Sequence, residues 1–242
     1  MIDPKPLWDY DDPAASEVRL REAAAAAGGA PEQAAWLTQV ARALGLQDRF
    51  DEGHAMLDGL PSSDDQTAVR ISLERGRLFR SAGDADAALP HFEAAAARAA
   101  SSGLEELQLD ALHMVALVVP PDERLARHEE ALAVARAATD PTARSWDAAL
   151  LNNMGMFHAG AGDHAAALDL FEQALAACER IGEPPRTRVA KWMVAWSLRE
   201  LGRTDEALAK QRALKAELDA AGETDPYVDQ EIAILTDQPP AM

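Results

Sequence analysis

Apolar residues recur along most of the chain at the three- and four-residue spacing of amphipathic helices, and short turns separate the helical stretches. The clearest example runs through residues 69–100, where an apolar pattern meets Gly83-Asp84 and then resumes. Glycine permits the left-handed backbone that ends one helix, and the Asp84 carboxylate can cap the amides that open the next. The pattern therefore predicts two helices joined by a tight turn.

The same order of special positions recurs in four blocks. Counting from Gly76, small and aromatic residues follow at offsets of three, four, five, four and three. The same spacing starts again at Gly155, at Ala195 and, with Asp48 in place of the turn glycine, at Ala41. Small residues let two helices cross closely, while aromatic residues fill the space beside the crossing. Each block is therefore predicted to be a helical hairpin.

These blocks resemble the tetratricopeptide repeat family, whose period of about 34 residues and small, aromatic and alanine positions they match. The family's early tryptophan is absent from the second block, where Ser72 stands, and most prolines expected at block ends are missing. The resemblance implies an all-α fold, a right-handed α-solenoid of about five hairpins. The positions that carry it most clearly are Gly76, Phe79, Gly83, Ala88, Phe92 and Ala95, then Gly155, Gly162, Ala167, Phe171 and Ala174.

A third, longer hairpin fits between the blocks at Gly76 and Gly155. Its helices are expected at Glu105–Val118 and Glu123–Thr139, because Pro120-Pro121 would break a continuous helix and make the turn. A single hairpin cannot bury its own apolar face, so we expect the units to stack into one domain over residues 13–236. The expected hairpins are 34–68, 69–103, 104–147, 148–187 and 188–222.

Both ends of the repeat run carry further segments. A helix is expected at Pro13–Ala27, and Asp225-Pro226 should open a C-terminal capping helix over 225–235. Residues 1–12 form an acidic and aromatic tail, and 237–242 form a C-terminal tail. The stretch after Lys215 contains seven acidic residues and no Lys or Arg, which suits the polar outer face that end repeats need.

Charge and composition restrict the partners. The chain of 242 residues carries 23 basic and 41 acidic side chains, a net charge of −18 that repels nucleic-acid backbones. No apolar run is long enough to span a bilayer, and Met1–Asp12 is not a signal peptide, so we expect a cytoplasmic protein without membrane contact. Cys178, the only cysteine, can form no disulfide within the chain and is expected to be buried as a small hydrophobe. The excess of Arg over Lys suggests a bacterial source.

Catalytic chemistry finds little support in the residue pattern. The six histidines lack metalloprotease spacing and have no cysteine partner, so neither a metal site nor a cofactor is expected. Gly160-Ala161-Gly162-Asp163 joins two predicted helices and lacks a phosphate-binding lysine, which favours a hairpin turn over a nucleotide loop. No nucleophile elbow is present, and the chain is not expected to be an enzyme.

The family resemblance also implies a concave groove lined by the first helix of each hairpin. In this acidic protein the implied groove is rich in arginine, which can hold carboxylates with two hydrogen bonds. The asparagines could bond a peptide main chain, and the tryptophans could form an apolar platform. In the repeat register that the resemblance implies, the residues six and three before, and one and four after, the small crossing residue of each first helix face this groove. This register also selects Thr38, Leu73, Gln108, Leu112, Ala149, Ala159 and Val189. The candidate partner-binding residues are Arg42, Arg70, Arg77, Arg80, Asn152, Asn153, Met156, Trp192, Trp196 and Arg199.

Each candidate has a purely structural alternative. The arginines could be solvated or paired with neighbouring acids such as Glu74, the tryptophans could pack in the core, and the asparagines could bond nearby backbone. The segment around Trp8 and Tyr10 has two interpretations as well. It either packs locally as a cap or inserts into a basic groove, its own or a neighbour's.

These features favour a non-enzymatic adaptor that binds a peptide or protein segment. Because arginines bind carboxylates, we expect that segment to be acidic or to carry a carboxylate. A self-assembling structural module is the main alternative, in which the groove or a cap packs on a second copy. The third is a ligand-sensing domain of a bacterial regulatory system, although no DNA-binding helix-turn-helix stands beside the repeats.

Overall fold

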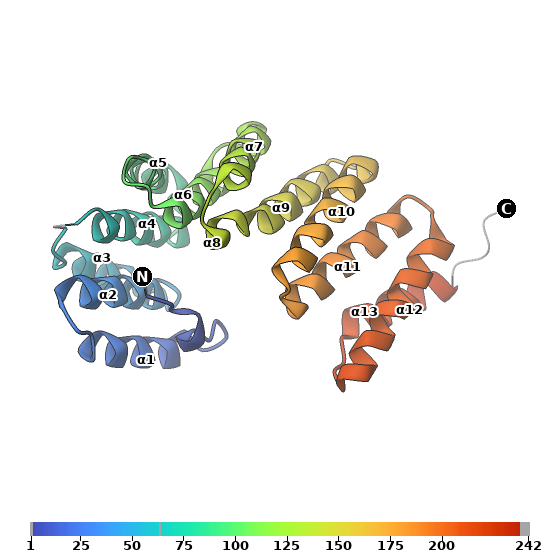
Figure 1. Cartoon of the computed structure of the whole chain (residues 1–242), viewed down its shortest axis with the longest axis horizontal. Coiled ribbons are helices and arrows are strands. Elements are labelled where there is room, and N and C mark those ends of the chain that lie inside the picture. Colours follow the sequence, from blue (N-terminus) through green and yellow to red (C-terminus); the bar gives the residue numbers. More distant parts are fainter. Residues whose placement is uncertain (1, 63, 238–242) are drawn as a thin grey trace. The chain divides into compact units, whose positions relative to one another are not determined.

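The computed structural model describes residues 2–62 and 64–237, which contain α-helices and one short 3-10 helix but no strand (Figure 1). The predicted all-α repeat fold is confirmed. The elements in order are η1 (Lys5–Leu7), α1 (Pro13–Ala25), α2 (Ala30–Gly45), α3 (Phe50–Asp58), α4 (Asp65–Ser81), α5 (Ala85–Ser101), α6 (Glu105–Val118), α7 (Pro121–Ala137), α8 (Pro141–Arg144), α9 (Trp146–Gly160), α10 (His164–Ile181), α11 (Pro184–Glu200), α12 (Thr204–Ala221) and α13 (Pro226–Asp237).

The helices fall into two compact units. Unit 1 extends to Ala131 and includes Ala138–Ala143, and unit 2 contains Leu132–Ala137 and the chain from Arg144 onward. In unit 1, α2 packs on both α1 and α4, and α5 packs on α4 and α6 (Figure 1). In unit 2, each helix from α9 to α13 packs on the next. The expected hairpin limits and the single domain over 13–236 stay predictions.

The hairpin turns are built as their sequence indicates. Gly83 takes a left-handed φ of +87°, and the Asp84 carboxylate then accepts a hydrogen bond of 2.9 Å from the Ala87 amide at the start of α5. The cap expected from Asp163 is confirmed in the same way at the start of α10. The first hairpin has no turn glycine, and Asp48 itself adopts the left-handed conformation, with φ of 59°. Aspartate tolerates that conformation better than most residues.

Two helix crossings depend on a glycine that faces a phenylalanine ring. A Cβ atom on Gly76 would lie 2.5 Å from Cε1 of Phe92, and one on Gly155 would lie 2.5 Å from Cε1 of Phe171. Both rings are fully buried. The sequence assigned small residues to these positions for close crossing, and the structure gives the reason for glycine in particular: the ring occupies the space that a methyl group would need.

The third hairpin follows its prediction closely, with one addition. Helix α6 spans the predicted Glu105–Val118, and α7 begins at Pro121, so the turn lies at the two prolines. The sequence reading missed α8, a single turn that begins at Pro141. Its start is held by Asp140, whose carboxylate accepts from the Thr142 amide at 2.6 Å. An Asp-Pro pair is a helix-start signal, and it could have indicated this turn.

Both terminal helices are confirmed, as α1 and α13. Cys178 is buried as expected, and burial raises the pKa of its thiol. Residues 238–242 of the expected C-terminal tail lie outside the described residues. None of the described helices combines the length and apolar composition that crossing a bilayer requires.

Candidate functional site

The predicted partner-binding residues lie on two faces, one in each unit. The unit 1 face is defined by residues on α2 and α4, and the unit 2 face by residues on α9 and α11. Their assignment to one ligand groove stays a prediction, and each face has its own chemistry. The unit 1 face comprises Arg42, Arg70, Arg77 and Arg80, and the unit 2 face comprises Asn152, Asn153, Met156, Trp192, Trp196 and Arg199.

On the unit 1 face, Arg77 is bonded to acids of its own unit. Its guanidinium donates to Glu74 at 2.6 Å and to Asp110 on α6 at 2.5 Å. Burial is the largest single influence on the pKa of Asp110 and would raise it, but the charge and hydrogen bond of Arg77, with smaller contributions from Arg42 and His113, together hold that pKa below its usual range. The hydrogen bonds of Arg77 therefore fasten α4 to α6, and two of its donors are taken.

Arg70 and Arg80 differ sharply in exposure. Arg70 is only 7% exposed, and burial lowers the pKa of its guanidinium despite the nearby carboxylates of Glu74 and Glu106. Its Nε atom has no hydrogen-bond partner among the described residues. Arg80 is exposed and forms no ion pair within the described chain. Arg80 can therefore meet an external carboxylate without breaking an internal ion pair.

Arg42 contacts aromatic rings of the N-terminal segment. Its guanidinium lies 5.5 Å from the centre of the Trp8 ring and 5.8 Å from that of Tyr10, and the two rings stack on each other. The Trp8 indole N–H donates to the Gln39 side-chain oxygen at 3.2 Å. The segment thus packs on α2 of its own unit, as the local-packing interpretation expects, and it lies beside a residue expected to face a ligand. Its insertion into a ligand groove stays a prediction.

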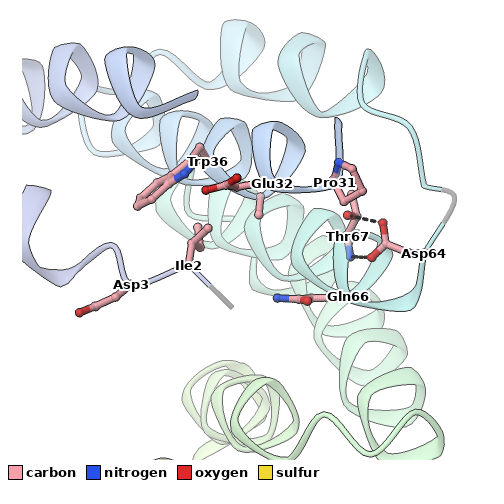
Figure 2. A pocket seen from close by; sticks show the side chains of 9 residues that line it. Ile2, Asp3, Pro31, Glu32, Trp36, Asp64, Gln66 and Thr67 are labelled. Atoms are coloured by element: carbon pink, nitrogen blue, oxygen red, sulfur yellow. Dashed lines mark hydrogen bonds between the residues drawn. The ribbon is translucent and has the colours of Figure 1, made fainter. Parts of the chain in front are cut away.

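The beginning of this segment lies at a cavity of about 530 Å³ beside the N-terminal ends of α2 and α4. Figure 2 shows Ile2 next to Trp36 and Glu32 of α2, with Gln66 of α4 on the other side. The N-terminal residues therefore run from this cavity along α2 to Arg42.

On the unit 2 face, α9 and α11 enclose a groove of about 340 Å³. Ala149, Asn152 and Val189, all selected by the repeat register, line it together with Cys178 of α10. Val189 is 59% exposed. Asn152 and its neighbour Asn153 are half-buried, and the side chain of neither makes a hydrogen bond with any described residue. The groove therefore combines an apolar lining with an amide whose donors and acceptor are available.

The tryptophans of this face are shared between surface and core. Trp192 and Trp196 stack with ring centres 6.4 Å apart, and both pack on a buried cluster that includes Leu198 and Leu235. Met156 on α9 is 48% exposed, and its contact with a ligand stays a prediction. Part of each ring therefore contributes to the core, since Leu235 of the C-terminal helix α13 belongs to the same cluster.

Arg199 is paired in the same manner as Arg77. Its guanidinium donates two hydrogen bonds, of 2.8 and 3.2 Å, to the carboxylate of Glu231 on α13. Glu231 is only 5% exposed. Sequence reasoning did not find Asp110 or Glu231 as partners. The signal was present, because Asp110 lies 33 residues after Arg77 and Glu231 lies 32 after Arg199, about one repeat period in each case.

The arrangement supports binding more than chemistry. Within residues 2–62 and 64–237 no group of three side chains is placed to hold a metal ion. The groove on the unit 2 face offers apolar contact and an amide, and the unit 1 face offers an arginine over aromatic rings. These are the contacts by which helical surfaces hold extended segments.

Comparison with known proteins agrees with the repeat pattern. The family model described as tetratricopeptide repeat matches residues 146–213. No curated protein sequence matches the chain significantly. Among solved structures, BtubC (BKLC) from P. vanneervenii is 18% identical with a TM-score of 0.62, covering 90% of this chain and 94% of its own.

Two further structures share the fold. The apo form of RapI is 9% identical with a TM-score of 0.71, covering 93% of this chain and 66% of its own. The apo quorum sensor NprR from B. thuringiensis is 16% identical with a TM-score of 0.61, covering 93% of this chain and 64% of its own. NprR has also been solved in complex with its cognate peptide NprX, with a TM-score of 0.52. At these identities the likeness is one of fold.

Proposed function

We propose that this chain, whose residues 146–213 match the tetratricopeptide repeat family model, is a non-catalytic module that binds a peptide or protein segment through the groove on its unit 2 face. The single observation that carries the proposal is the joint lining of that groove by Ala149, Asn152 and Val189. The side chains of Ala149 and Val189 offer apolar surface, and the Asn152 amide offers hydrogen-bond donors and an acceptor.

An extended segment fits these contacts. A small apolar side chain of the ligand would enter the groove beside Val189, and the Asn152 amide would bond the ligand main chain at the edge. An asparagine held on a helix is fixed before binding, which lowers the entropic cost of ordering the contact. NprR, which shares the fold, is solved with a peptide, and we propose a comparable use of the repeat surface here.

A carboxylate on the ligand would find a cation at the same groove. Arg186 lines it, and the side chains of Arg186 and its partner Glu183, 3.1 Å apart, are 50% and 42% exposed. Exposed pairs of this kind contribute little free energy, about 0–1 kcal/mol, so a ligand carboxylate can compete for the guanidinium. We therefore retain a carboxylate-bearing segment as the proposed ligand class.

We propose a cytoplasmic, bacterial protein in which residues 13–236 act as one repeat domain. The lone cysteine, Cys178, suits a reducing compartment because the chain can form no internal disulfide.

The test is a peptide selection with matched variants. Peptides would be selected from a displayed random library on the wild-type chain, and their affinities then measured against Val189→Asp and Val18→Asp. Val18 on α1 is 56% exposed, so it matches Val189 in type and exposure but lies in the other unit. We expect Val189→Asp to weaken binding at least tenfold and Val18→Asp to leave it unchanged. Peptides that bind Val189→Asp as well as the wild type would refute this groove as the site.

A further inference from the structure

The N-terminal segment, residues 2–12, contacts the unit 1 face much as a bound peptide would. We call these residues the strap. Only Lys5–Leu7 form a helical turn, and the rest of the strap up to Asp12 is irregular chain. Leu7 and Trp8 are half-buried against a core cluster that includes Leu20 and Val40, whereas Tyr10 is 60% exposed.

The strap is recognised chiefly through Trp8. Gln39 and Arg42, one turn apart on α2, contact different parts of the indole: Gln39 accepts the ring N–H at 3.2 Å, and Arg42 lies over the ring at 5.5 Å. Gln39 is itself 4% exposed and donates to Glu74 of α4 at 3.4 Å, which fixes the orientation of its amide. A buried acceptor at the ring edge and a cation over the ring are a specific match to tryptophan.

The backbone hydrogen bonds of the strap go to α1 instead. The Leu7 carbonyl accepts from Arg19 at 3.0 Å, and the Asp9 amide donates to the Ser16 hydroxyl at 2.7 Å. The bonds to α2 are thus made by the Trp8 side chain, while the tether to α1 keeps that side chain close. A short tether supplies an effective concentration on the order of millimolar, so even a weak side-chain contact remains occupied.

We propose that the strap is an internal ligand of the unit 1 face. The surface formed by Gln39, Arg42 and the neighbouring core of α1 and α2 binds an extended segment that carries a leucine-tryptophan pair. The strap holds this surface closed until a segment of another protein with the same pair displaces it. This site lies in unit 1 and does not depend on the groove proposed for unit 2.

The test uses a synthetic, fluorescently labelled peptide with the sequence of residues 2–12, added to the full chain. Fluorescence anisotropy would compare the wild type with Trp8→Ala, in which the internal ligand is weakened. We expect the peptide to bind Trp8→Ala at least tenfold more tightly than the wild type, because the wild-type surface is already filled. Adding Arg42→Ala to Trp8→Ala should weaken binding at least fivefold, and a peptide with alanine in place of its tryptophan should not bind.

Arg21→Ala in the Trp8→Ala background is the matched control, since Arg21 lies on α1 and pairs with Glu17 on the surface. Binding should be unaffected by it. Equal peptide affinity for the wild type and Trp8→Ala, or no effect of Arg42→Ala, would overturn the proposal. If circular dichroism shows that Trp8→Ala loses helix, Tyr10→Ala replaces it, with at least a threefold difference from the wild type expected. Light scattering at the assay concentration should show a wild-type monomer. A dimer would overturn the proposal that each chain's own strap occupies its surface.

Discussion

The contact between Gly76 and Phe92 gives the sharpest test of the repeat architecture. In Gly76→Ala the new methyl carbon would lie 2.5, 2.7 and 2.9 Å from three atoms of the Phe92 ring. Favourable carbon contacts lie at about 3.5–4.0 Å, so the ring would have to move by roughly 1 Å. Phe92 is fully buried in a cluster with Ala88, Ala95 and Leu107, which leaves it no free space.

The expected magnitude is a balance of two effects. Overpacking of a core costs about 1–3 kcal/mol, and replacing a mid-helix glycine by alanine contributes up to about 1 kcal/mol of stability through helix propensity. We expect Gly76→Ala to lower the free energy of unfolding by about 1–2 kcal/mol. In the Phe92→Leu background the clash is removed, so the same glycine substitution should become neutral or stabilising.

One repeat of this chain already has alanine and leucine in place of the glycine and phenylalanine. At the corresponding positions of the first hairpin stand Ala41 and Leu57, which share one buried cluster. Alanine is therefore accepted where the partner is not a ring. Gly160 supplies the matched control, because a Cβ atom there would meet nothing within 4 Å. Gly160→Ala should leave stability unchanged or raise it.

The assay is urea unfolding followed by circular dichroism, with hydrogen exchange of α4 amides as a local measure. The single and double variants at positions 76 and 92 form a thermodynamic cycle, and we expect a coupling free energy of about 1–3 kcal/mol. Additive effects of the two substitutions, or a stabilised Gly76→Ala, would show that the ring does not set the requirement for glycine.

Three further predictions concern polar groups that are buried or half-buried between helices. Gln211 is fully buried, and its side-chain amide has no hydrogen-bond partner in the described part of the chain. Gln211→Leu should therefore raise the free energy of unfolding by about 1–3 kcal/mol in urea titrations. A lower free energy of unfolding would show that the amide is not unbonded in the folded chain. Burial lowers the pKa of His113 to about 4. As the pH is lowered from 6.5 to 4, this imidazole gains a proton in the unfolded chain before it does so in the folded one. The free energy of unfolding should therefore fall over that range by up to about 3 kcal/mol. The urea midpoint of the wild type should be lower at pH 5 than at pH 7, and His113→Gln should reduce this difference. Asp110→Asn removes one of the two carboxylates to which Arg77 donates, the other being Glu74. The free energy of unfolding should fall by about 1–3 kcal/mol in the same titration, and an unchanged midpoint would count against the Arg77–Asp110 pair.

The candidate site was only partly predictable. The repeat register identified Ala149, Asn152 and Val189 as neighbours on one face, because equivalent positions of successive hairpins lie side by side. The state of each arginine was not predictable in this way. Arg42, Arg70 and Arg80 have the same charge in the sequence, but they lie over aromatic rings, inside the core and in solvent respectively.

By itself, the sequence determined the helices and their turns, since these depend on interactions within a few residues. The spacing from Gly76 to Ala95, the cap at Asp84 and the break at Pro120-Pro121 are local signals of that kind. Only the tertiary structure decided which charges are paired and what lies on each face. Arg77 meets Asp110 across one repeat period, and Trp8 meets Gln39 across 31 residues. Such contacts depend on distances between helices, and those distances exist only once the hairpins have stacked.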